Sequence, residues 1–127
     1  MGAMNKAVII RSGRLEEEPT RHGGGVFKRV ILRQGTIPRL NQFATARFLE
    51  GDVVAKHRHT DMVEVFFLLD GEATLCLEGE DRPVLPEDTV VVYPGILHGF
   101  RIVKPSRLLY FSLAWPPDSD PDHTASS

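Results

Sequence analysis

The chain has 127 residues, one cysteine and a net charge of −2. This length fits a single domain with a core that folds without disulfides. The absence of a basic excess argues against nucleic acid and anionic membranes as partners. The lone Cys76 cannot form an intrachain disulfide and indicates a reducing compartment such as the cytoplasm. The longest N-terminal apolar run, "AVII", is too short for a membrane span or the core of a signal peptide.

The two ends of the chain predict an arm and a tail on either side of one folded domain at residues 26–115. The opening "MGAM" is interpreted as an expression remnant at residues 1–3, followed by a natural start at Met4. Residues 1–25 include the charged, glycine-rich "RSGRLEEEPTRHGGG" and predict an N-terminal arm. Residues 116–127 are rich in proline, aspartate and serine and predict a disordered tail.

The region between the ends is a series of short β-like runs separated by glycine and proline turn signals. No stretch of ten or more residues repeats its apolar positions with the 3.6-residue period of a helix. We therefore expect an all-β sandwich or barrel. The predicted strands are 26–32, 41–49, 53–57, 62–69, 72–78, 89–93, 98–103 and 106–114.

The predicted strand "MVEVFFLL", residues 62–69, is apolar on both of its faces. Such a strand is buried on both sides. One face fits the barrel interior, and the other needs a cover from the arm or from a second subunit. The pattern therefore predicts a homodimer.

A group of histidine and glutamate side chains predicts a metal site. His57 and His59 are two residues apart, so on an extended strand both imidazoles point the same way, about 6.5–7 Å apart. Glu64 returns on the next strand, where a buried carboxylate needs a charge partner or a metal. His98 follows a proline-glycine turn and can supply a fourth donor. Nitrogen and oxygen donors in this mixture suit one divalent Fe, Mn, Ni, Cu or Zn ion.

The spacing of these residues resembles the first motif of the cupin superfamily. That motif is glycine, five residues, His-X-His, three or four residues, glutamate, six residues and glycine. The chain matches it completely with Gly51, His57, His59, Glu64 and Gly71.

The second cupin motif is matched only in part. Gly95 and His98 agree with it, whereas Glu87, Tyr93 and Ile102 stand where the family has glycine, proline and asparagine. The turn "LPED" at residues 85–88 is predicted to be type I, with proline in second position, which requires no glycine.

The resemblance covers roughly residues 40 to 114 and implies a small single-domain cupin β-barrel, the double-stranded β-helix or jelly roll, which is usually dimeric. It implies that His57, His59, Glu64 and His98 hold the metal. It also implies a range of activities too broad for the fold to choose among.

The residues favour a metal-dependent enzyme that acts on a small, partly apolar substrate with two oxygen donors, because the expected pocket wall is mostly aromatic and aliphatic. The chemistry would be dioxygenase-like or that of a Lewis-acid isomerase, lyase or cyclase. Tyr93 and Tyr110 are candidate general acids or bases. Arg47 is a candidate cation for a substrate carboxylate if its strand face points inward. The alternative is a non-catalytic cupin module that binds a small ligand or a metal.

Overall fold

The computed structural model describes residues 7–20 and 25–115 and confirms the all-β prediction. The only helix within these ranges is the 3-10 turn η1 (Ser12–Arg14), and no described helix is long and apolar enough to cross a membrane. The predicted expression remnant and tail lie outside the described residues. The strands are β1 (Glu18–Pro19), β2 (Phe27–Leu32), β3 (Leu40–Phe48), β4 (Val53–His57), β5 (Met62–Leu77), β6 (Glu80–Val84), β7 (Thr89–Val92) and β8 (His98–Ala114).

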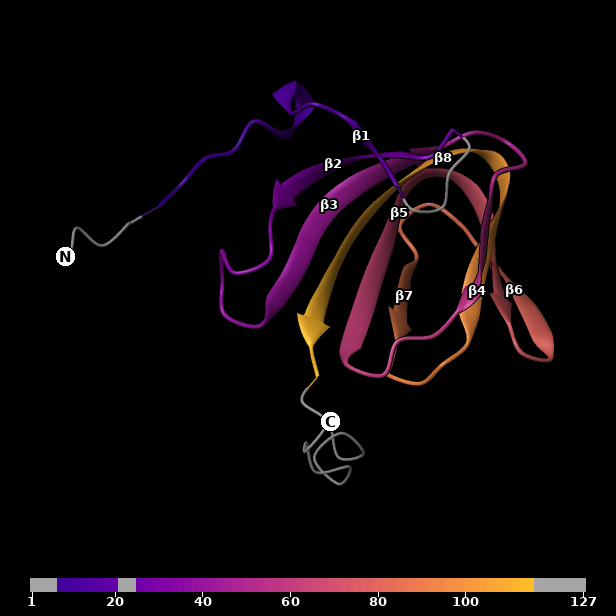
Figure 1. Cartoon of the computed structure of the whole chain (residues 1–127). Coiled ribbons are helices and arrows are strands. Elements are labelled where there is room, and N and C mark those ends of the chain that lie inside the picture. The colour runs from indigo at the N-terminus through magenta and orange to yellow at the C-terminus, as the bar shows by residue number, and fades with distance from the viewer. Residues whose placement is uncertain (1–6, 21–24, 116–127) are drawn as a thin grey trace.

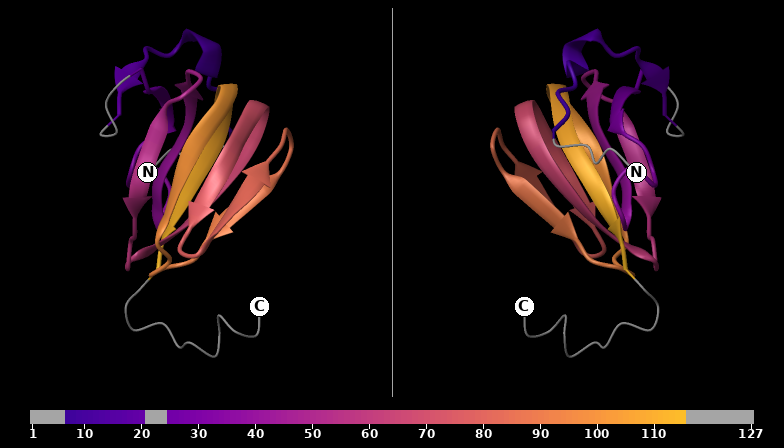
Figure 2. Two further views of the ribbon diagram at one scale, coloured as in Figure 1. Left: turned by 90° about the vertical axis from the view of Figure 1, so that its right-hand side faces the viewer. Right: turned by 90° about the vertical axis from the view of Figure 1, so that its left-hand side faces the viewer.

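Two long strands, β5 and β8, organise the whole molecule. They pair antiparallel along their full length, from Met62 opposite Ala114 to Leu77 opposite His98, and lie side by side in Figure 2. The sequence predicted four shorter strands here, separated by turns at "DGE" and "VKPS", and that prediction was wrong. The turn residues mark bends within continuous strands.

The bend in β5 arises from irregular pairing with β8 between Leu68 and Ala73. A β-bulge adds a residue to one strand and so changes which side chains face inward. Before the bend the core receives even-numbered residues, such as Phe66 and Leu68, and after it odd-numbered ones, such as Ala73 and Leu75. The strand therefore turns a corner while keeping its apolar side chains inside.

Gly71 lies at this corner with a φ of +96°. A β-carbon at this position would overlap the backbone of Pro105 and Ser106 in β8. The amide of the next residue, Glu72, donates a hydrogen bond to the Ser106 hydroxyl at 3.1 Å. The glycine of the first motif is thus required both by its backbone conformation and by the close approach of the two bent strands.

The bends divide one continuous sheet into two halves that face each other (Figure 1). The large half contains β1, β2, β3, the C-terminal part of β8, the N-terminal part of β5, and β7. The small half contains β4, the N-terminal part of β8, the C-terminal part of β5, and β6. Apolar side chains between the halves form the core, with Leu68 and Ile102 among the most completely buried.

Two strands were not predicted from the sequence. β6 carries the charged, proline-containing "EDRPV", which resembles a turn, but it lies at a sheet edge, where charges and proline are tolerated. β1 lies within the predicted arm and pairs with β2, with Glu18 opposite Lys28.

The turn "LPED" differs from its predicted type. Asp88 N donates to Leu85 O at 2.9 Å, as in any tight turn, but Glu87 has a φ of +73°. A type I turn has negative φ at both central positions, so the prediction was wrong, and this turn has the positive φ of type II. Glu87 N also donates to Leu68 O at 2.8 Å, which ties the turn to the bend of β5. A glutamate therefore occupies a conformation that glycine adopts without strain.

Replacement of Glu87 by glycine should stabilise the protein. Left-handed backbone costs a non-glycine residue about 1–2 kcal/mol, and the greater freedom of glycine in the unfolded chain offsets part of that gain, so we expect about 1 kcal/mol. Urea denaturation measures the difference. Glu50→Gly is the matched control, since Glu50 is an exposed turn residue without positive φ. Equal effects of the two substitutions would contradict the assignment of strain to Glu87.

Candidate metal centre

Three side chains from the two halves of the sheet converge inside the barrel. His57, at the end of β4, is paired with His98, at the start of β8, and residues directly opposite each other project to the same side. Glu64 comes from the large half, on β5. One potential ligand atom from each of the three lies within 4.8 Å of the other two. The site therefore bridges the two halves, and each half supplies part of it.

A bulge in β4 directs His57 into the barrel. Val54 is paired with Phe100 and His57 with His98, so three residues of β4 span two of β8. With regular pairing, Lys56 would stand opposite His98 and point inward in place of His57. Gly99 makes room for this bulge, because a β-carbon there would overlap the backbone of β4 at Val54. Local irregularity thus decides which side chain reaches the site.

Both paired histidines are held by backbone carbonyl groups. The Nδ1 atom of His57 lies 2.8 Å from Ala55 O, and that of His98 lies 2.9 Å from Ile96 O. A carbonyl oxygen accepts only, so in each neutral ring Nδ1 carries the hydrogen and Nε2 carries the lone pair. This arrangement is typical of metal-ligating histidines, whose second nitrogen is fixed by a hydrogen bond.

Glu64 and His98 bring two acceptor atoms face to face. Glu64 Oε1 and His98 Nε2 are 3.0 Å apart, and His98 is 1% exposed. Both atoms are buried, and neither has an aligned hydrogen-bond partner among the described residues. With the hydrogen of His98 on Nδ1, these two lone pairs repel unless a proton or a metal ion lies between them. Two imidazoles and a carboxylate around this point fit a divalent transition metal.

His59 lies beside this group, beyond the end of β4 and not on the strand as the sequence predicted. The loop that carries it is fixed by a 2.7 Å hydrogen bond from Gly95 N to His59 O. Its Nε2 is 3.8 Å from Glu64 Oε1, and its ring meets that of His57 edge to face at 4.9 Å. It therefore reaches Glu64 but does not belong to the set of three mutually close donors.

The neighbouring charges and polar contacts shift the pKa values of Glu64 and His98 in the direction opposite to burial. Burial alone would raise the pKa of Glu64, but the contact with His98 and the charges of His59, His98 and His57 outweigh it and lower that pKa. Burial would lower the pKa of His98, but its contacts with Glu64 and with the Ile96 carbonyl outweigh it and raise that pKa. Without a metal, the pair therefore favours a carboxylate and a proton on His98.

Comparison with known proteins agrees with this architecture. The sequence model of the cupin domain matches residues 44–113, more than half of the chain. The chain belongs to the cupin family. None of the curated proteins compared matches this cupin.

Solved structures of other cupins share its fold. KdgF from a Halomonas species is 20% identical with a TM-score of 0.72, over 90% of this chain and 97% of that one. A predicted oxalate decarboxylase from Thermotoga maritima is 20% identical with a TM-score of 0.76, over 84% and 99%. An RmlC-like cupin from Shewanella frigidimarina is 20% identical with a TM-score of 0.68, over 84% and 88%.

The two candidate tyrosines of this cupin have different surroundings. Tyr110 packs against the core and stacks on Phe66 with ring centroids 5.9 Å apart. Burial, together with the charges of Glu64 and Glu18, raises the pKa of Tyr110 to about 12, so its phenol stays protonated at neutral pH. Tyr93 is 51% exposed and contacts Trp115 edge to face. Of the two, Tyr110 is the one inside the barrel.

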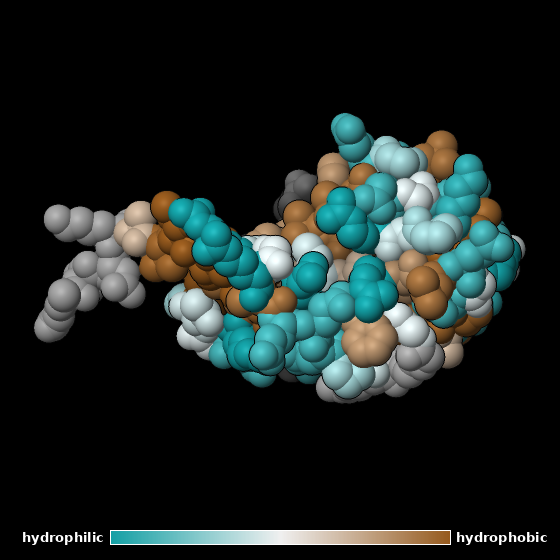
Figure 3. All heavy atoms as spheres, turned by 90° about the horizontal axis from the view of Figure 1, so that it is seen from above, coloured by the Kyte–Doolittle hydropathy of each residue, from teal (hydrophilic) through white to brown (hydrophobic). Residues whose placement is uncertain are grey.

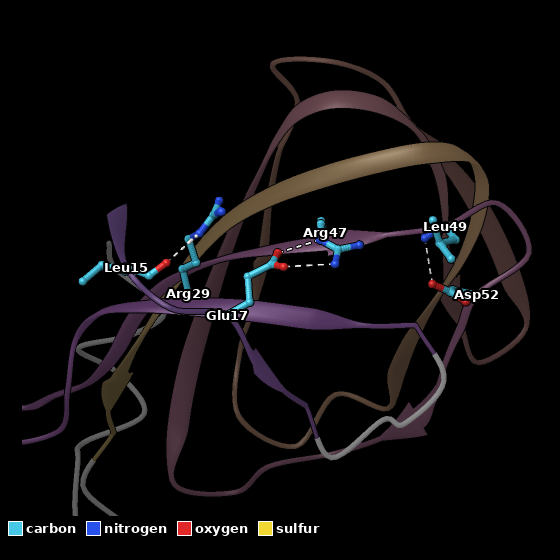
Figure 4. Close-up of polar contacts among 6 residues, drawn as sticks. All are labelled: Leu15, Glu17, Arg29, Arg47, Leu49 and Asp52. Atoms are coloured by element: carbon cyan, nitrogen blue, oxygen red, sulfur yellow. Dashed lines mark hydrogen bonds and ion pairs between the residues drawn. The ribbon is translucent and has the colours of Figure 1, made fainter. Parts of the chain in front are cut away.

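Arg47 lies on the outer face of β3, between the buried inward-facing residues Ala46 and Phe48. Its guanidinium binds both carboxylate oxygens of Glu17, at 2.6 and 3.0 Å (Figure 4). It also lies 5.0 Å above the centre of the Phe27 ring. The structure thus places Arg47 away from the histidines, in a contact that anchors the N-terminal arm.

Sequence reasoning missed a row of inward-facing polar side chains. Gln42 is opposite Ser112, and Ser112 is opposite Glu64, so all three project from the same face of the large half. The alternation in "QFATA" indicates which face of β3 points inward. The small residues Ala44 and Ala46, on the face of Gln42, suit a crowded interior better than Phe43 does. The residue predicted to face inward, Arg47, lies on the opposite face of this strand.

Metal binding should weaken as the pH falls. His98 must lose its proton to bind a metal, and since its pKa is raised, protons should compete above the ordinary histidine value of 6.5. Equilibrium dialysis with zinc between about pH 5 and 8 measures this loss. Circular dichroism at each pH serves as the control for unfolding. Affinity that stays constant down to about pH 6 would contradict a role for His98.

Proposed function

We propose that this cupin holds one divalent transition metal through His57, Glu64 and His98, with His59 as a fourth ligand. The observation that carries the proposal is the buried contact between Glu64 Oε1 and His98 Nε2, two acceptors at 3.0 Å without aligned partners among the described residues. A metal ion would replace the proton between these two atoms and bind both of them. The two carbonyl-anchored histidines supply the preorganisation that such a site needs.

The same site supports an enzyme that acts on a small, oxygen-chelating, partly apolar substrate. A bound metal supplies Lewis acidity, which polarises a substrate oxygen. The wall beside it contains Phe66 and Phe100, in edge-to-face contact at 5.1 Å, which suits a partly apolar compound. Tyr110 is diagonal to Glu64 across β5 and β8, close enough for a bound molecule to contact both.

The protonation state of Tyr110 bears on its role in the site. With a pKa of about 12 its phenol remains protonated at neutral pH. It can donate a hydrogen bond that orients and polarises a substrate oxygen, whereas a pKa this high makes it a weak general acid. Tyr110 thus suits an orienting role in either class of reaction, the dioxygenase-like or the Lewis-acid isomerase, lyase or cyclase.

Single substitutions around the "HRH" segment test the metal site. His57→Ala should reduce metal affinity more than about 100-fold, beyond the 10–100-fold loss expected for a residue that only orients a ligand. His59→Ala should also remove most of the metal. Arg58→Ala is the matched control, since this exposed residue lies between the two and should keep full occupancy. Elemental analysis of each purified protein gives the result, with melting temperature as a check on folding.

Full occupancy in the His57→Ala protein would contradict the site itself. Full occupancy in the His59→Ala protein alone would remove His59 from the ligand set and leave the other three.

We also propose that the protein is a homodimer in which the outer face of the large half is covered by a second copy. The strand pairing places Phe43, Phe111, Val65 and Val91 in one row across four strands of that face. Each of them remains partly or largely exposed in the single chain. A continuous apolar row of this kind is typical of an interaction surface.

The N-terminal segment supports the same assembly. Val8 and Ile9 are 70% and 77% exposed, and the segment that carries them projects from the barrel (Figure 3). An apolar segment that the described residues leave this exposed gains from burial against another copy, at about 25 cal/mol per Å².

Sedimentation at micromolar concentrations should show a dimer. Phe111→Lys should shift it toward the monomer, because the change places a charge in the centre of the apolar row. Val53→Lys is the matched control, since Val53 is an exposed apolar residue on β4, in the small half. A monomeric parent protein, or equal effects of both substitutions, would refute this arrangement.

A further inference from the structure

Lys28 carries its charge on the inner face of the barrel. It lies on β2 opposite the buried Ala46, and the next inward residue of β2, Val30, lies opposite the buried Ala44. Directly opposite residues project to the same side, so the Lys28 side chain lies along the inner wall, where it is half-buried. A lysine on this wall is unexpected, since an ammonium ion loses hydration there.

No described carboxylate forms an ion pair with Lys28. Its ammonium donates a 3.0 Å hydrogen bond to Gln42 Oε1, and no carboxylate among the described residues lies within ion-pair distance of it. Glu18 stands opposite Lys28 on β1, but its carboxylate is bound to Arg33 at 2.8 Å, and that hydrogen bond, helped by the charge of Lys28, lowers the pKa of Glu18. The three charged residues together therefore leave one positive charge at this end of the wall.

The wall between Lys28 and the metal centre is lined with hydrogen-bonding groups. Because Gln42 uses its oxygen toward Lys28, its amide nitrogen remains as a donor. Ser112 lies between Gln42 and Glu64, and neither its hydroxyl nor that of Tyr110 bonds to any part of the chain that the structure describes. Gln42 and Glu64 are two strand spacings apart, about 10 Å.

We propose that Lys28 and Gln42 form an anion subsite that binds a carboxylate of the substrate while its other end reaches the metal centre. The inference rests on the function proposed above and specifies its substrate class: a short oxo- or hydroxy-carboxylic acid with a second carboxylate several bonds from the chelating oxygens. The ammonium of Lys28 matches the single charge of the distal carboxylate, and the amide nitrogen of Gln42 offers that carboxylate a hydrogen bond. Lys28 is a specificity-determining residue in this arrangement and takes no part in proton transfer.

Two acids of equal length test the subsite. 2-Oxoglutarate and 2-oxopentanoate share the same chelating end, but only the former carries a distal carboxylate. Calorimetry with the zinc-loaded full chain should show 2-oxoglutarate binding at least about ten-fold more tightly, as one charge-assisted hydrogen bond provides. Lys28→Met should remove this preference without changing zinc content or the affinity for 2-oxopentanoate.

Two further variants guard against indirect effects. Lys28→Arg keeps the charge and should keep the preference. Lys104→Met removes a lysine that is exposed and paired with Glu72, and should behave as the parent protein.

Equal binding of the two acids, binding of neither acid to zinc-loaded protein, or a preference that survives in Lys28→Met would each overturn the subsite. Absence of zinc from the parent protein would instead refute the proposed metal site, so the two failures are distinguishable.

Discussion

The buried contact between Glu64 and His98 is the constraint on which the rest of the structure depends. An apolar barrel gains nothing from two lone pairs at 3.0 Å, so this contact requires a proton or a metal ion between the two atoms. The surrounding structure prevents the pair from separating. His98 is held from behind by the Ile96 carbonyl, and Glu64 is fixed within a strand that is paired on both edges. The contact persists because the fold forces it, which is the mark of a preorganised binding site.

The geometry of that contact comes from irregular features of the sheet. Bends in β5 and β8 allow one sheet to supply both walls, so that a carboxylate from one half meets imidazoles from the other. The bulge in β4 then replaces an inward lysine by His57. Gly71 and Gly99 are required at these two places because backbone occupies the space that a side chain would need. Each irregularity costs local strand pairing and is tolerated where it positions a ligand.

The sequence predicted the parts of the site that depend on residue type and spacing, and missed those that depend on bends. The histidines, Glu64 and the β-like alternation are local signals, and the family resemblance covers them. "DGE" and "VKPS" contain residues that end strands elsewhere, and only the partner strand reveals that the chain continues through them. The turn "LPED" was predicted to be type I from its proline in second position, whereas Glu87 has positive φ and donates a hydrogen bond to Leu68. The inward face of β3 is marked in the sequence only by the small residues Ala44 and Ala46, since both faces carry apolar and polar side chains.

The two cations of β2 and β3 show why burial and pairing must be considered together. Arg47 and Lys28 are both positive residues on paired strands, and the sequence made Arg47 the candidate for a substrate carboxylate. On the outer face of β3, Arg47 is paired with Glu17, and this ion pair anchors the arm. Lys28 lies on the inner face, where its only hydrogen-bond partner among the described residues is the side-chain amide of Gln42. The same wall of the barrel also carries the candidate metal ligand Glu64. A half-buried ammonium with no carboxylate bound to it costs stability on its own. An anion bound at the proposed subsite would offset that cost, and the position of Lys28 would fix where the anion lies.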